Sequence, residues 1–88
     1  MHYVYIIHSA KLNRFYVGET ADLDRRIAWH NNGEFKDSST AIAKDWALFW
    51  QLECASIEVA RKIELHIKRM KSRTYYHNLV RYQDITAR

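Results

Sequence analysis

Residues 3–30 read YVYIIHSAKLNRFYVGETADLDRRIAWH, and their pattern of apolar and polar side chains sets the expected architecture. Residues 2–8 alternate at a period of two, which predicts a strand with Tyr5 on one of its faces. After a short polar turn, residues 14–18 predict a second strand that carries Tyr16. Strands so close in sequence pair most simply as antiparallel neighbours, which would place both tyrosines on one sheet and allow them to share one side of it.

A helix is expected directly after the second strand. Thr20 and Asp22 supply capping groups for a helix over about residues 21–30. At about 100° per residue, His30 falls on the apolar stripe of this helix and Arg26 lies beside it. The two are i,i+4 neighbours and therefore close in space. We expect the helix to turn its core face and these two polar groups toward the same place.

The remainder of the chain adds one strand and two helices. The expected elements are a surface loop over 34–44, a third strand over 46–54 with Trp46, Trp50 and Cys54 on one face, a helix over 56–70, and a helix over 72–81. The order is ββαβαα. It predicts a single α/β domain over residues 1–88, in which helices flank one three-stranded antiparallel sheet.

The composition is that of a small compact domain. The chain has 88 residues, 48% of them hydrophobic, with two glycines and no proline, which indicates a folded rather than a disordered chain. No apolar run reaches the roughly 20 residues of a membrane helix, and the N-terminus lacks the features of a signal peptide. Because Cys54 is the only cysteine, a disulfide framework and a thiolate metal cluster are excluded. These features predict a cytoplasmic protein without a membrane partner.

Positive charge gathers in the C-terminal third. The net charge is +4, and residues 61–88 hold eight of the 14 Lys and Arg residues but only two of the ten Asp and Glu residues. A basic segment attached to a near-neutral body suits a polyanion such as nucleic acid. A solubilising helix surface is the alternative, and charge alone does not separate the two.

Several short motifs occur in an order that resembles the GIY-YIG nuclease superfamily. They are Tyr3-Val4-Tyr5, Tyr16-Val17-Gly18, Asp22-Leu23-Asp24-Arg25-Arg26-Ile27, His30-Asn31, and the run from Glu64 to Arg73. The resemblance covers nearly the whole chain and is closest to small stand-alone members, which are similar to the N-terminal nuclease domain of the UvrC excinuclease subunit. Tyr3 stands where the first motif of the family has glycine, but the neighbouring tyrosine is in place.

The resemblance implies hydrolysis of a DNA phosphodiester bond with one divalent metal ion, Mg²⁺ or Mn²⁺. It assigns the family tyrosines to Tyr5 and Tyr16, of which we expect Tyr5 to orient or deprotonate the water. Arg26 would hold phosphate oxygens, and His30 would assist proton transfer. Glu64 would bind the metal ion, with water and phosphate oxygens as the other ligands. An asparagine that the family often has about a dozen residues later is Tyr76 here, so its role is not carried over.

Each of these residues also has a simpler interpretation when it is taken alone. Aromatic residues such as Tyr5 and Tyr16 are common in strands. Arg26 could be a solvated helix charge, and His30 an ordinary residue at a helix end. Glu64 could form an i,i+4 ion pair within its own helix. The ordered set favours the site, because chance does not place all five residue types at the spacing of the family.

Two functions remain open at this point. The first is a metal-dependent DNA endonuclease, a monomer or weak homodimer, with branched or damaged DNA as the candidate substrate and DNA repair or processing as its setting. The second is a nucleic-acid-binding module that cuts poorly or not at all and binds through Lys68, Lys71 and Arg73. The complete set of catalytic residue types favours the nuclease, since a pure binder has no evident need for all of them.

Overall fold

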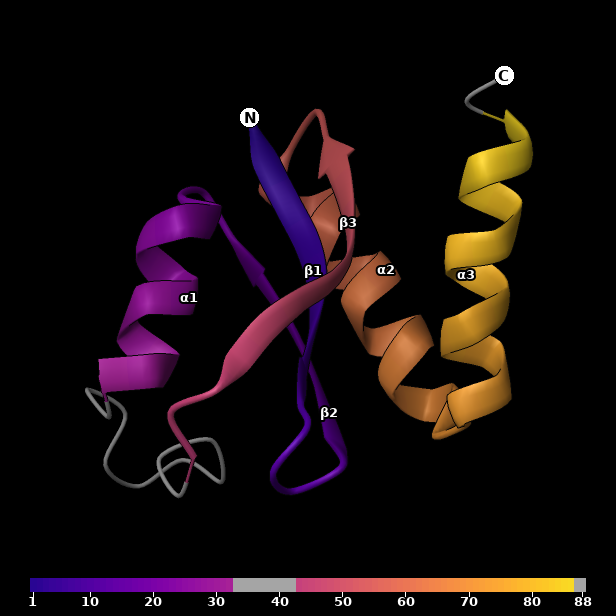
Figure 1. Cartoon of the computed structure of the whole chain (residues 1–88). Coiled ribbons are helices and arrows are strands. Elements are labelled where there is room, and N and C mark those ends of the chain that lie inside the picture. The colour runs from indigo at the N-terminus through magenta and orange to yellow at the C-terminus, as the bar shows by residue number, and fades with distance from the viewer. Residues whose placement is uncertain (33–42, 87–88) are drawn as a thin grey trace.

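A computed structural model of the chain describes the backbone of residues 1–32 and 43–86, and side chains as far as Arg81. Most of the expected loop over 34–44 lies outside these residues. The described elements follow the expected order (Figure 1): β1 (His2–Ser9), β2 (Arg14–Thr20), α1 (Leu23–Asn32), β3 (Trp46–Cys54), α2 (Ile57–Met70) and α3 (Arg73–Thr86). All strand pairs are antiparallel, and the sheet order is β2-β1-β3. The expected fold class is confirmed.

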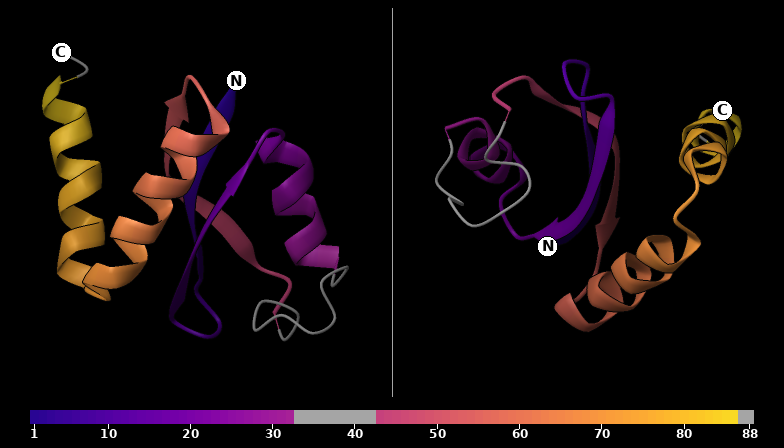
Figure 2. Two further views of the ribbon diagram at one scale, coloured as in Figure 1. Left: turned by 180° about the vertical axis from the view of Figure 1, so that it is seen from behind. Right: turned by 90° about the horizontal axis from the view of Figure 1, so that it is seen from below.

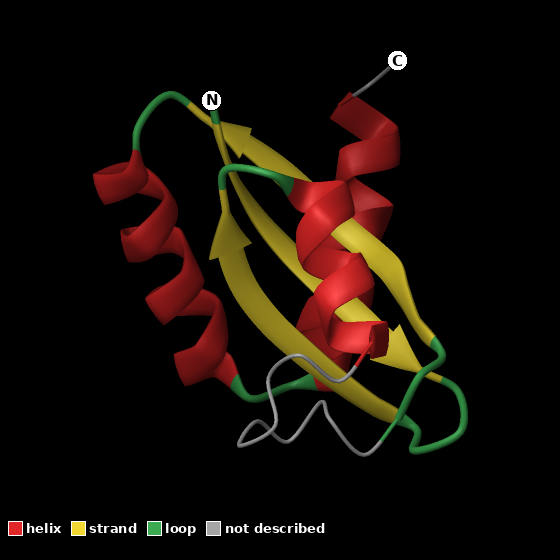
Figure 3. Ribbon diagram, turned by 90° about the vertical axis from the view of Figure 1, so that its left-hand side faces the viewer, coloured by secondary structure: helices red, strands yellow, loops and turns green. Residues whose placement is uncertain are grey.

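The sheet separates the helices into two layers. Helix α1 covers one face of the sheet, and α2 and α3 lie on the other (Figures 2 and 3). Because β1 is the central strand, its side chains are buried from both directions. Val4 and Ile6 pack toward α2, whereas Tyr5 and Ile7 pack toward α1. None of the helices in the described part of the chain combines the length and apolar character that a membrane-spanning segment needs.

One expectation about β3 is wrong. Its tryptophans do not share a face, because Trp46 packs with the α1-side cluster and Trp50 with the α2-side cluster. The cause is a shift in the β1–β3 register: Ile6 lies opposite Trp50, but Ile7 lies opposite Leu48. The extra residue is Phe49, and such a bulge reverses the alternation beyond it. As a result β3 contributes one large aromatic side chain to each core cluster.

The ends of the helices differ from expectation by a few residues. Helix α1 begins at Leu23 rather than residue 21, because Asp22 is its cap: the Asp22 Oδ1 accepts a hydrogen bond from the Arg25 amide at 3.2 Å. It ends at Asn32 rather than residue 30, and α3 runs to Thr86 rather than residue 81. Helix α2 begins at Ile57, one residue later than expected, because Ser56 is its cap: the Ser56 hydroxyl accepts from the Val59 amide.

Asn31 fastens the end of α1 to the start of β3. Its side-chain Nδ2 donates to the Trp46 carbonyl oxygen at 2.9 Å, and its Oδ1 accepts from the Trp46 amide at 2.7 Å. The Asn31 side-chain amide thus satisfies both the amide and the carbonyl oxygen of Trp46, as the backbone of a neighbouring strand would. Because α1 carries Arg26 and His30, this contact also helps to fix their position over the sheet.

Candidate active site

Tyr5 lies at the centre of the candidate site. It projects from β1 toward α1 and is 1% exposed. Gly18 is its partner on β2, and a Cβ atom at Gly18 would lie 2.5 Å from the Tyr5 Oη and 2.6 Å from its Cζ. Such contacts are impossible without movement, so the phenol ring occupies the space that a side chain at Gly18 would fill. Gly18 of the second motif is therefore needed to leave room for the Tyr5 ring of the first motif.

His30 forms a hydrogen bond with the hydroxyl of Tyr5. The distance between the Tyr5 Oη and the His30 Nε2 is 2.9 Å, and His30 is 2% exposed. Burial of the imidazole lowers the pKa of His30 to about 4, and the nearby charge of Arg26 acts in the same direction. The imidazole is therefore neutral at neutral pH, and its Nε2 can accept the phenol proton.

Tyr16 completes an aromatic cluster with these two residues. Its ring centroid lies 6.5 Å from that of Tyr5 and 4.9 Å from that of His30. The expectation that Tyr5 and Tyr16 share one side of the sheet is therefore met. Burial raises the pKa of the Tyr5 phenol above its ordinary value, and the neighbouring Tyr16 raises it further. A resting Tyr5 is protonated, and it needs a partner to take its proton before it can act as a base.

Arg26 brings positive charge to this cluster from the first half of α1. Its guanidinium lowers the pKa of His30 and opposes the rise in the pKa of Tyr5. Arg26 therefore influences the protonation of both residues that share this hydrogen bond. The same guanidinium lies 5.2 Å from the centroid of the Trp29 ring. Arg26 also lines a pocket of about 340 Å³ beside the site. A phosphate bound to Arg26 would meet a cation next to a neutral acid–base pair.

Glu64 approaches the cluster from α2, which packs over β1 and β2 on the other face of the sheet. Its charge is close enough to contribute to the raised pKa of Tyr5. The Glu64 side chain is 15% exposed, and its Oε1 accepts from the Lys68 Nζ at 2.7 Å. The helical ion pair and the placement near the tyrosines are thus both present in one side chain.

The donor chemistry of Glu64 fits a hard divalent cation. A carboxylate oxygen suits Mg²⁺ or Mn²⁺. One Glu64 oxygen already pairs with a cation in the structure, the Lys68 ammonium. Among the described side chains of residues 1–32 and 43–81, no three of His, Cys, Asp or Glu form a ready cluster for a metal ion. An ion at Glu64 would therefore depend on water and on the phosphate oxygens of the substrate for its other ligands.

The three basic residues expected to bind nucleic acid have different surroundings. Lys68 is paired with Glu64, at the site itself. Lys71 is exposed and ends α2 in the left-handed conformation, with φ 44°. Arg73 fastens α3 to the β1–β2 turn, because its Nη1 donates to the Asn13 Oδ1 at 2.9 Å and its Nη2 donates to the Asn13 carbonyl oxygen. Arg73 therefore has a structural contact that sequence reasoning missed.

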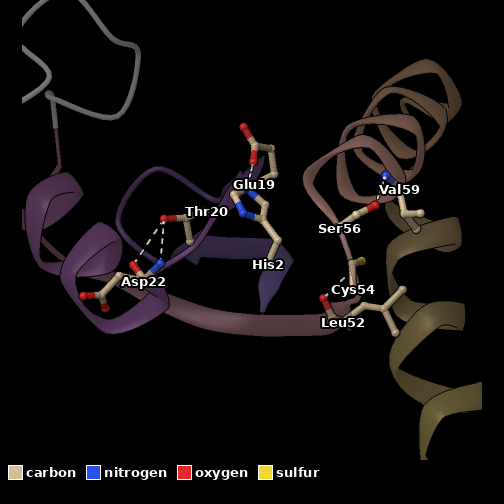
Figure 4. A network of polar contacts seen from close by, with 8 residues as sticks. All are labelled: His2, Glu19, Thr20, Asp22, Leu52, Cys54, Ser56 and Val59. Atoms are coloured by element: carbon tan, nitrogen blue, oxygen red, sulfur yellow. Dashed lines mark hydrogen bonds and ion pairs between the residues drawn. The ribbon is translucent and has the colours of Figure 1, made fainter.

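Sequence reasoning also missed His2 and Glu19, which form an ion pair in the pocket beside Arg26 (Figure 4). Glu19 follows Gly18 on β2, and its charge adds to the raised pKa of Tyr5. The pairing of β1 with β2 would have placed Glu19 near Tyr5. If Tyr5 lies opposite Gly18, antiparallel order places Val4 opposite Glu19, and a charged residue so close to the tyrosine belongs to its surroundings.

Comparison with known proteins supports the resemblance. The family model for the GIY-YIG catalytic domain matches residues 1–80. No curated protein and no solved structure matches the chain.

Proposed function

The chain belongs to the GIY-YIG nuclease superfamily, and we propose that it is a metal-dependent endonuclease that hydrolyses DNA phosphodiester bonds in DNA repair or processing. One observation carries the proposal: Tyr5, buried and bonded to a neutral His30, is surrounded by charges from α1, α2 and β2. Arg26 supplies the positive charge and Glu64 a negative charge from the opposite layer. Packing alone does not require a buried phenol to be placed between an arginine and a carboxylate.

The Tyr5–His30 pair is suited to activating water. In the proposed step, the Tyr5 hydroxyl passes its proton to the His30 Nε2 as it takes one from the attacking water. The raised pKa of Tyr5 argues against a standing phenolate, which is why the imidazole is part of the base. The pKa of His30 is lowered by burial and by the charge of Arg26. A phosphate bound to Arg26 would offset the second of these, the guanidinium charge. Substrate binding would therefore make His30 a better proton acceptor.

Arg26 would bind the phosphate that is cleaved. A guanidinium can donate two parallel hydrogen bonds to phosphate oxygens, and its charge offsets the negative charge that develops in the transition state. Glu64 would hold the divalent ion, which supplies Lewis-acid stabilisation of the leaving oxygen when bound. The charges of both residues act on the Tyr5 phenol, which supports a phosphate bound within reach of the water-activating pair.

A substrate panel tests this function. Labelled single strands, duplexes, flaps, junctions and RNA are incubated with the full chain in Mg²⁺, in Mn²⁺ and in excess chelator. We expect cleavage of at least one DNA substrate with either metal ion, and none with chelator. Absence of cleavage on every substrate with both ions, from protein shown to be folded, would refute the nuclease.

The alternative, a binding module without useful catalysis, draws support from the surface of α2. Its basic side chains are exposed: Arg61, Lys62, Lys68, Arg69 and the terminal Lys71. Charge reversal at Lys68 and Lys71 should weaken DNA binding and make the salt dependence of the affinity less steep, by about 0.9 for each phosphate that is no longer neutralised. Arg73 is left intact in this test, because reversing it would also break its contact with the β1–β2 turn. Strong salt-dependent binding with no cleavage would favour the module.

A further inference from the structure

A pocket of about 340 Å³ opens beside the candidate active site, between the β2–α1 connection and the start of α2. It shares Arg26 with the active site. If Arg26 holds the phosphate that is cleaved, the occupant of this pocket belongs to a nucleotide attached to that phosphate. This step rests on the proposed function.

One wall of the pocket is a layer of aromatic and guanidinium groups. The Arg25 Cζ lies 4.9 Å from the centroid of the Trp29 ring, and the Arg26 Cζ lies 5.2 Å from it. Trp29 itself belongs to the lining of the pocket. Indole and guanidinium planes are the surfaces on which nucleobases stack.

The lining of the pocket also holds two acidic residues. They are Glu19, which pairs with His2, and Asp22, which caps α1 (Figure 4). Carboxylates repel a phosphate, but they accept hydrogen bonds from the amino groups on the edges of bases. A pocket lined by both an aromatic ring and carboxylates therefore suits a base better than a second phosphate.

We propose that this pocket, which we call the Trp29 pocket, binds an unpaired nucleobase adjacent to the phosphate held by Arg26. Trp29 and Arg25 provide the stacking surface, and the side of Glu19 and Asp22 faces the edge of the base. A base within a duplex already has both faces covered by its neighbours, so only a base outside the stack can enter. The substrates selected by the pocket are DNAs with an unpaired base at the cleavage point, such as flaps, bulges and single-stranded junctions.

The test measures DNA affinity by fluorescence anisotropy in the Glu64→Ala background, so that cleavage does not interfere. Two short duplexes are compared, one with a single bulged nucleotide and one with an abasic residue in the bulge. We expect the bulged base to bind about 5- to 150-fold more tightly, which is the range for stacking of one base. Trp29→Leu should remove this difference by weakening only the complex with the base, whereas Trp29→Phe should keep most of it.

A second variant guards against a folding defect. Arg25→Gln, on the exposed side of α1, should reduce the preference for the bulged base, whereas Arg14→Gln at the start of β2, outside the pocket, should leave it unchanged. Equal affinity of the parent protein for the two duplexes, or a preference that survives in Trp29→Leu, would overturn the proposal. Because binding is the readout, the preference without any nuclease activity would refute the proposed function alone, and nuclease activity without the preference would refute the Trp29 pocket alone.

Discussion

Replacement of Gly18 by alanine tests whether the two tyrosine-bearing strands are built around one another. The new Cβ would lie 2.5 Å from the Tyr5 Oη and 2.6 Å from its Cζ. Tyr5 is 1% exposed and its hydroxyl is bonded to His30, so the ring cannot swing into solvent and keep that contact. Either β2 moves away from the ring, or the ring leaves His30.

The expected loss of stability combines three contributions. Overpacking of a buried site costs about 1–3 kcal/mol, and loss of the Tyr5–His30 hydrogen bond adds about 0.5–1.5 kcal/mol. Replacing glycine by alanine in a strand returns about 0.4–1 kcal/mol, because the unfolded chain loses freedom. The free energy of unfolding of Gly18→Ala should therefore fall by about 2 kcal/mol.

Urea unfolding of a double-mutant cycle separates the steric effect from a general effect of alanine. In a Tyr5→Leu background the phenol is gone, so Gly18→Ala should cost little or stabilise slightly. Cleavage by Gly18→Ala, measured at a temperature where the variant is folded, should also fall, since Tyr5 no longer meets His30. The same cost in both backgrounds, or no cost in the parent protein, would refute the reasoning.

Two further predictions concern His30 and Lys68. Because the pKa of His30 is lowered from 6.5 to about 4 on folding, the unfolded chain takes up its proton first, and stability falls as the pH drops below about 6.5. Between pH 7.5 and pH 5 this should remove about 2 kcal/mol from the free energy of unfolding. Urea titrations should show a smaller loss in His30→Gln but an unchanged loss in the exposed control His66→Gln. Lys68→Met removes the ammonium that competes for Glu64, so Mn²⁺ should bind DNA-free protein about twofold more tightly, which is the worth of an i,i+4 ion pair on a helix. Electron paramagnetic resonance of free Mn²⁺ measures this; equal affinity of Lys68→Met and the control Lys71→Met would contradict it.

Local patterns in the sequence were sufficient for the element order. Alternation in β1 and β2 depends only on neighbouring residues, and the caps Asp22 and Ser56 act within one helical turn. The antiparallel pairing of the strands that carry Tyr5 and Tyr16 followed from the shortness of the turn between them. That the two tyrosines share one side depends on the register of the pair, which the structure supplies. Helical spacing likewise brought Arg26 and His30 together.

Features that depend on pairing between distant segments were not accessible. The bulge at Phe49 arises where β3 meets β1, and no pattern within β3 marks it. From the sequence, Arg73 was expected to be a free basic residue, because its partner, Asn13, is far away in sequence. The Trp29 pocket needs β2, α1 and the start of α2 in their final places. In each case the deciding contact is long-range, so residue type alone carried no signal.

In the proposed function, Glu64 serves the chemistry next to Tyr5 and does more than pair with Lys68 within its own helix. The most direct test compares single-turnover nicking of DNA in Mg²⁺ by the parent chain, Glu64→Ala, and Glu58→Ala, in which an exposed glutamate of the same helix is removed. We predict that Glu58→Ala cleaves at the rate of the parent chain and that Glu64→Ala, still folded, loses cleavage by at least about 100-fold. Equal rates for Glu64→Ala and the parent chain would contradict the claim.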